Sequence, residues 1–185
     1  VLTLLITSAL LIMNFESIAI RQVSRSDLNS LKQASREAAK MTDTAKTLSF
    51  QIYGDLTISK LIFFPKPDIY DVTLAMQQLN NYRLSMPFIE SIYVYNASSG
   101  MYYISSNTFR NGSQTEQELD DRGIVDILHN LKEYRPYVPI PRTYTIGDGK
   151  QVSSYSYLSY DMLEKNASAA VGVNIAESWV NQDFG

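Results

Sequence analysis

The chain has 185 residues, of which 45% are hydrophobic and 19% are charged, with a formal net charge of −3 and no cysteine. This length suits one domain, or one domain plus an appendage, and the apolar content excludes a disordered chain. The missing cysteine excludes disulfide frameworks, thiol catalysis and cysteine-ligated metal centres. A single histidine, His129, argues against a histidine-rich metal site, and the slight acidity offers no electrostatic basis for binding nucleic acid.

The first 15 residues form an uncharged apolar run that ends before Glu16. A membrane-spanning helix needs roughly 20 apolar residues. We therefore interpret residues 1–15 as the outer part of a transmembrane helix whose beginning precedes Val1. The alternatives are a buried core helix and the apolar part of a secretory signal, although the run lacks the small-residue pattern of a cleavage site.

Residues 16–60 are predicted to form a long helix followed by a turn. No proline or glycine occurs between Ile18 and Ile52, so nothing forces a helix to end there. Apolar residues recur at alternating spacings of three and four, which places them in one narrow seam. The seam either packs along the chain's own domain or pairs with a second copy in a homodimeric coiled coil. Its members are Leu31, Ala34, Ala38, Met41, Ala45, Leu48 and Ile52.

The remaining residues, 61–185, are predicted to form a globular module. Helical periodicity comes first, and runs rich in β-branched and aromatic residues follow, most of them joined by short turns. This order favours an α+β fold in which the long helix packs on an antiparallel sheet. The predicted elements are helices over residues 56–64 and 69–86, strands over 88–96 and 101–105, a surface loop over 106–121, a helix over 123–131, and strands over 142–146, 152–160 and 169–175.

Few side chains are arranged for catalysis. The segment at residues 147–150 contains Gly-Asp-Gly-Lys, but its spacing differs from a phosphate-binding loop and fits a hairpin turn. The adjacent acids Asp120 and Asp121 are expected to cap the helix that follows them. No motif of a serine hydrolase, zinc protease or dinucleotide-binding enzyme is present. We therefore predict no enzymatic activity, no cofactor and no metal site.

Tyrosines are dense around the predicted strands. A tyrosine combines an apolar ring with a hydroxyl, so a tyrosine-lined cavity can hold a small polar ligand. Arginine can bind a carboxylate through two hydrogen bonds, and aspartate can bind an amine. The alternative is that tyrosines simply pack well on half-buried strands. The candidate ligand-binding residues are Tyr95, Tyr103, Arg135, Tyr137, Arg142, Tyr144, Tyr155, Tyr157 and Asp161.

Several of these patterns occur together in one known family. They are the apolar start, the unbroken helix to Ile52, the run Phe88–Asn96 with its Ser-Gly turn, and Val171–Ile175 followed by Glu177–Val180. In this combination the chain resembles the Cache sensor domains of bacterial membrane receptors. The resemblance is closest to those that precede histidine kinases or AraC-type regulators in Gram-positive soil bacteria.

The resemblance implies a PAS-like sheet outside the cell, with residues after about 16 extracellular at the cell membrane. It also implies a pair of modules, of which this chain is the membrane-distal one. Amino-acid-binding members carry an arginine followed by a tryptophan-containing segment, then a tyrosine and an aspartate. Here Arg135 is followed by Tyr137 rather than tryptophan, while Tyr157 and Asp161 supply the rest. An amino acid, a sugar and an organic acid therefore all remain candidate ligands.

The function implied is ligand sensing by a transmembrane signalling receptor, in which binding of a small-molecule nutrient moves the long helix. The alternative is a membrane-anchored ectodomain that binds another protein or dimerises and has no small-molecule site.

Overall fold

A computed structural model describes residues 2–146, 149, 151–160 and 169–182, and gives the backbone alone for residues 2–25 and 180–182. The chain divides after Ala39 into two compact units. Helix α1, Leu2–Gly54, begins in the first unit and ends in the second, uninterrupted as the absence of proline and glycine predicted. No helix in the described part of the chain has both the length and the apolar character that a membrane span requires.

The seam of α1 differs between the two units. In the second unit, Ala45, Leu48 and Ile52 are at most 1% exposed, so this part of the seam packs within the domain. In the first unit Leu31 is 67% exposed and Ala38 is also exposed. The structure therefore confirms packing along the chain's own domain for the later seam positions. Pairing of the earlier ones with a second copy stays a prediction.

The second unit follows the predicted order of helices and strands. Two details differ from the sequence prediction. The helix expected from residue 56 begins only at Ser59, because the Asp55 carboxylate first accepts the backbone N–H groups of Thr57 and Ile58 in a turn. The expected surface loop at residues 106–121 contains a short strand and a 3₁₀ turn. The elements are α2 Ser59–Phe63, α3 Ile69–Leu84, β1 Ile89–Asn96, β2 Met101–Ser106, β3 Gly112–Thr115, η1 Glu116–Glu118, α4 Arg122–His129, η2 Leu131–Glu133, β4 Ile140–Thr145, β5 Gln151–Tyr160, β6 Ala169–Ala176 and α5 Glu177–Gln182.

The strands form one six-stranded antiparallel sheet in the order β3-β2-β1-β6-β5-β4. The first and last strands of the chain's second unit, β1 and β6, pair at its centre, for example through Tyr95 opposite Ala170. The predicted α+β fold class, a helix on an antiparallel sheet, is confirmed.

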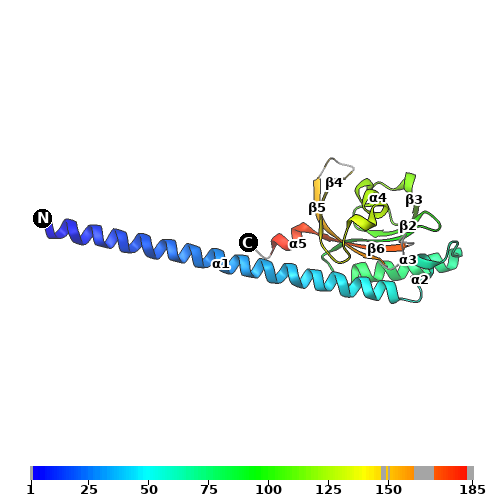
Figure 1. Ribbon diagram of the computed structural model, residues 1–185, viewed down its shortest axis with the longest axis horizontal. Coiled ribbons are helices and arrows are strands. Elements are labelled where there is room, and N and C mark those ends of the chain that lie inside the picture. The colour runs from blue at the N-terminus through cyan, green and yellow to red at the C-terminus, as the bar shows by residue number, and fades with distance from the viewer. Residues whose placement is uncertain (1, 147–148, 150, 161–168, 183–185) are drawn as a thin grey trace. The chain divides into compact units, whose positions relative to one another are not determined.

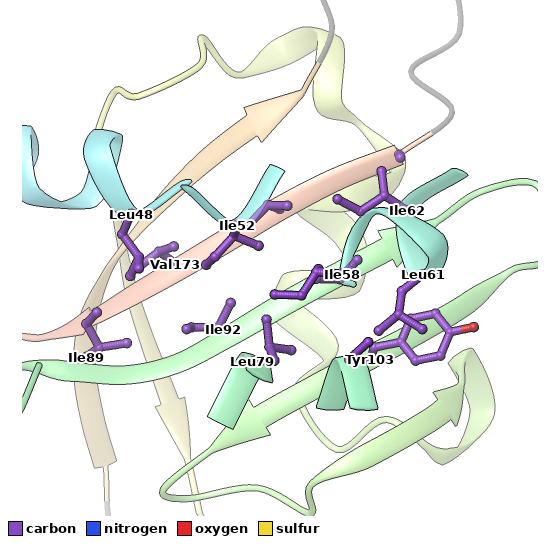
Figure 2. Close-up of a cluster of buried hydrophobic side chains, with 14 residues drawn as sticks. Leu48, Ile52, Ile58, Leu61, Ile62, Leu79, Ile89, Ile92, Tyr103 and Val173 are labelled. Carbon is purple, nitrogen blue, oxygen red and sulfur yellow. The ribbon is translucent and has the colours of Figure 1, made fainter. Parts of the chain in front are cut away.

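The sheet carries helices on both faces (Figure 1). On one face the last turns of α1 pack with α2 and α3 over apolar side chains of β1 and β6. Figure 2 shows the side chains that meet there, among them Leu48, Ile52, Leu79, Ile92 and Val173. On the opposite face α4 packs Ile124 and Leu128 against Tyr93, Ile104 and Leu158 of the strands. We call these the α1 face and the α4 face. Successive side chains of a strand point to opposite faces, so each strand contributes to both cores.

Candidate functional site

The α4 face carries a line of buried polar side chains across four neighbouring strands. Ser91 on β1, Asn174 on β6 and Ser156 on β5 are fully buried, and Arg142 on β4 is 9% exposed. The Asn174 amide donates to Ser91 Oγ at 2.9 Å, and Ser156 Oγ donates to Asn174 Oδ1 at 2.6 Å. Arg142 Nη1 in turn donates to Ser156 Oγ at 3.3 Å. Each polar group thus has a partner, which offsets the cost of its burial.

The line ends at Asp121, which joins the sheet to α4. Arg142 Nη2 donates to Asp121 Oδ1, and the two side chains are 6% and 0% exposed. The Tyr93 hydroxyl donates to Asp121 Oδ2 at 3.0 Å. As the sequence predicted, Asp121 also caps α4, because its Oδ1 accepts the backbone N–H of Ile124 at 3.1 Å. One carboxylate therefore satisfies the buried guanidinium and fixes the start of the helix.

A glycine lets the arginine come close to α4. A Cβ atom on Gly123 would lie 3.2 Å from Arg142 Nη2, tighter than most contacts of real Cβ atoms. The second residue of α4 therefore leaves room for the guanidinium beside the capping carboxylate.

Burial shifts the titration of two tyrosines beside this ion pair. The pKa of Tyr93 is raised well above its ordinary value, first by burial and then by the negative charge of Asp121. Burial also raises the pKa of Tyr144 to about 12, with the charges of Glu90 and Asp121 adding to the effect and Arg142 opposing it. Both phenols are therefore neutral at physiological pH, and the Tyr93 hydroxyl keeps the proton that it donates to Asp121.

A pocket of about 470 Å³ lies between the start of α4 and strand β4. The pocket is lined by α4 and the turn before it, through residues 120–123, 126 and 127, and by β4, through residues 140–145. Phe109 and Tyr134 complete the lining. We call it the α4 pocket. Its volume falls within the range that small-molecule ligands occupy in proteins.

Aromatic rings and hydroxyls shape the α4 pocket. The rings of Phe109 and Tyr144 lie 5.2 Å apart, and the Arg142 guanidinium lies 5.6 Å from the centre of the Tyr144 ring. The hydroxyls of Tyr144 and Ser154 are fully buried and have no hydrogen-bond partner at normal distance among the described residues, although Ser154 lies close enough to lower the pKa of Tyr144. The wall thus offers a ligand an aromatic surface.

A second pocket, of about 430 Å³, lies at the other end of α4 and is lined by Tyr95 and His129. His129 ends α4, and its Nε2 atom lies 3.3 Å from the Tyr102 hydroxyl and 3.2 Å from Glu116 Oε2. The side chains of His129 and Glu116 are 43% and 47% exposed, so this pair is a surface feature.

The residues predicted from the sequence to bind ligand do not gather around one cavity. Arg142 and Tyr144 line the α4 pocket, and Tyr95 lines the second pocket on the same face. Arg135 is exposed in the passage before β4. Asp161 lies outside the described residues.

The other four candidates belong to the α1 face or the passage that reaches it. Tyr103 packs in the core beneath α2 and α3, and Tyr155 packs beside Tyr157, whose hydroxyl lies 3.3 Å from Thr42 Oγ1 on α1. Tyr137, with a φ of 62°, stacks its ring on Phe50 of α1 at 5.4 Å. These tyrosines pack against helix α1 and the core, the alternative that the sequence left open.

Of the residues that line the α4 pocket, sequence reasoning named only Arg142 and Tyr144 as ligand-binding, and it missed, among others, Asp121 as the partner of Arg142 and Phe109 as part of the wall. Asp121 was expected only as a helix cap, and 21 residues separate it from Arg142 with no pattern that links them. Among the described residues, no group of three or more acidic or histidine side chains is placed to hold a metal ion.

The sequence matches no protein-family profile and no curated protein. Solved structures, however, share its fold. The ligand-binding domain of the Campylobacter jejuni chemoreceptor Tlp3, in complex with L-valine, is 14% identical with a TM-score of 0.55, over 83% of this chain and 60% of that one. The extracellular domain of vpHK1S-Z8, a protein assigned as a histidine kinase, is 10% identical with a TM-score of 0.62, over 88% of this chain and 62% of that one.

A third solved structure comes from a sensory box/GGDEF family protein of Vibrio parahaemolyticus, 11% identical with a TM-score of 0.62, over 85% of this chain and 62% of that one. The chain thus spans about three fifths of the length of these structures. At such low identity the likeness concerns the fold, which is that of Cache and PAS-like sensory domains.

Proposed function

We propose that the chain is the extracellular ligand-sensing domain of a transmembrane signalling receptor, and that the α4 pocket holds its ligand. The observation that carries the proposal is the pocket itself, bounded by α4 and β4 on the face of the sheet opposite α1. The solved structures with this fold come from sensory proteins, including a chemoreceptor domain in complex with L-valine. In this proposal the domain binds a small nutrient and does no chemistry on it.

Signalling requires that the ligand favour one arrangement of the domain over another. The α4 pocket touches the start of α4, which Asp121 ties to Arg142 and, through the buried polar line, to β5, β6 and β1. On the other face Tyr157 of β5 reaches Thr42 of α1. We propose that a ligand alters the sheet from the α4 face and that α1 passes the change toward the membrane.

The apolar run at residues 1–15 supports a place for the start of α1 in the cell membrane, with the residues that follow outside the cell. An output domain, such as a histidine kinase, would then receive the signal on the other side. These are proposals about the whole receptor, of which this chain is the sensing part.

A second candidate function is protein interaction or dimerisation without a small-molecule site. The seam residue Leu31, which is 67% exposed, favours it, because an exposed apolar side chain on a helix suits a partner helix.

A thermal-shift screen of the chain against amino acids, sugars and organic acids and amines tests the first proposal. A true ligand at about 100 times its Kd should raise Tm by about 5–10 °C. Phe109→Ala and Tyr144→Ala should shrink this rise, whereas Tyr157→Phe, on the α1 face, should preserve it. A rise that all three variants leave unchanged would place the ligand elsewhere, and silence across the screen would favour the interaction function.

A further inference from the structure

We infer that the α4 pocket selects a ligand that carries a protonated amine, and that it does not bind a carboxylate through Arg142. This inference rests on the proposed function and deepens it by naming the chemical class of the ligand. It follows from how the charged groups of the pocket are already used within the chain.

Neither arginine of the pocket is available to an anion. Arg142 is buried and bound to Asp121 and Ser156. Arg122 donates to the backbone carbonyls of Glu116 at 2.9 Å and Gln117 at 3.2 Å, which direct its guanidinium toward η1. A ligand carboxylate would have to displace Asp121 from Arg142, which would leave a buried carboxylate without its partner.

Two carboxylates of the pocket, by contrast, are free. Asp120 and Asp126 line it, are exposed, and form no ion pair or side-chain hydrogen bond among the described residues. With Asp121 neutralised by Arg142, they outnumber the remaining cation, Arg122. They flank the start of α4, where the helix dipole alone would attract an anion, and their charge opposes that attraction.

The remaining wall suits an ammonium group as well. A cation binds favourably over an aromatic face, and Phe109, Tyr134 and Tyr144 all line the pocket. Carboxylates at the rim and aromatic rings in the wall together match the chemistry of a protonated amine.

Four small probes of similar size separate the ligand classes: butylammonium, 1-butanol, butyrate and L-valine. Each is titrated into the 185-residue chain, with binding followed by NMR shifts of the labelled protein and by calorimetry. Butylammonium should bind with the lowest Kd and perturb the resonances of Asp126 and Tyr144. Butanol and butyrate, which lack the positive charge, should bind about two- to fivefold more weakly, as the loss of an exposed charge pair predicts.

Variants locate the effect. Asp120→Asn and Asp126→Asn should each raise the Kd for butylammonium about two- to fivefold, the range measured for exposed ion pairs. Asp43→Asn removes an equally exposed carboxylate from α1, remote from the pocket, and should leave the Kd unchanged. Neither pocket substitution removes an intramolecular side-chain bond, so both variants should fold as the parent does.

Three results would overturn the inference. If butyrate or L-valine bound to this pocket more tightly than butylammonium, the charge argument would fail while the sensing function stood. Equal losses from Asp43→Asn and Asp126→Asn would mean that amines bind the acidic surface without selection by the pocket. Absence of binding by all four probes would count against both the inference and the proposed pocket.

Discussion

The two faces of the sheet are built from the same strands but stabilised by different chemistry. On the α1 face, Leu48, Ile52, Leu79, Ile92 and Val173 form an apolar core beneath three helices. The buried polar side chains of this face bond to the helices: Arg83 of α3 donates to Ser105 of β2, and Asn96 of β1 donates to the Leu61 carbonyl of α2. On the α4 face, buried serines, an asparagine and an ion pair are interleaved with the apolar contacts of α4. The α1 face holds its helices mainly through apolar contacts. On the α4 face the line of polar side chains ends at Arg142 and Asp121, which also line the α4 pocket.

Strand alternation makes this division possible. On β5, for example, Tyr157 packs toward α1 while Ser156 joins the polar line of the opposite face. A change that a ligand makes on one face therefore acts on strands whose other side chains hold α1. The predictions that follow test whether the two faces depend on different interactions.

The largest expected effect is on the α4 face. Arg142→Met would leave Asp121, whose side chain is fully buried, without its guanidinium. Breaking a buried ion pair in this way costs about 3–5 kcal/mol of the free energy of unfolding. Urea unfolding at neutral pH measures the loss. The double variant Asp121→Asn, Arg142→Met should recover part of the lost free energy of unfolding, because no charge then remains unpaired. If the loss in the double variant equalled the sum of the losses in the two single variants, Asp121 and Arg142 would not be energetically coupled.

The next effect tests the apolar α1 face. Leu48→Ala removes a fully buried side chain and should lower the free energy of unfolding by about 2–5 kcal/mol. Leu31→Ala, at an equivalent seam position that is 67% exposed, should change it by no more than about 0.5 kcal/mol. A large loss for Leu31→Ala, growing with protein concentration, would indicate that a second copy covers this part of the seam.

The contrast between the faces also explains what the sequence could reveal. Period-two and period-3.6 patterns depend on the position of each residue along the chain, so α1, α3 and strands such as β1 and β5 were predictable. The alternation on β5 even placed Tyr155 and Tyr157 on one face and Ser154 and Ser156 on the other, as the structure shows. The polar loop over residues 106–121 carried no such pattern, and β3 was missed there.

Membership of the candidate site could not be predicted in the same way. The tyrosines identified possible ligand-binding positions. Whether each of them faces α1 or α4, however, depends on which helix covers each face of the sheet. Arg142 and Tyr144 were predicted, while Tyr103 and Tyr157 pack on the α1 face. The pairing of Asp121 with Arg142 joins a helix cap to a strand of the sheet, and only the tertiary fold brings them together.

The same substitution should act in opposite directions on the two faces. Ser156→Ala removes a hydroxyl that donates to Asn174 and accepts from Arg142, and should cost about 1–3 kcal/mol. Ser49 on α1 is buried on the α1 face, and its hydroxyl has no hydrogen-bond partner in the described part of the chain. Ser49→Ala should therefore stabilise the domain by about 0.5–1 kcal/mol, since alanine also favours the helix more. Thermal and urea unfolding compare the two; destabilisation by both would show that Ser49 has a hydrogen-bonded role.

The last effect appears only in alkaline solution and belongs to the α4 face. The pKa of Tyr144 rises from an ordinary 10.0 to about 12, chiefly through burial. Above pH 10 the unfolded chain releases this proton while the folded chain retains it, so unfolding becomes more favourable. The stabilisation is complete below pH 10 and is lost as pH rises toward 12.

Urea unfolding at intervals between pH 8 and about 11.5 should show this decline in the free energy of unfolding. Tyr144→Phe should make the decline less steep, because phenylalanine has no proton to release. Tyr93, whose pKa is also raised by burial and by Asp121, continues to contribute in the same direction. Tyr93→Phe should therefore flatten the decline further, and the slope that remains should come from other tyrosines whose pKa burial raises, such as Tyr95 and Tyr102 on the same face. An unchanged slope in both variants would mean that Tyr93 and Tyr144 are as open to solvent when folded as when unfolded.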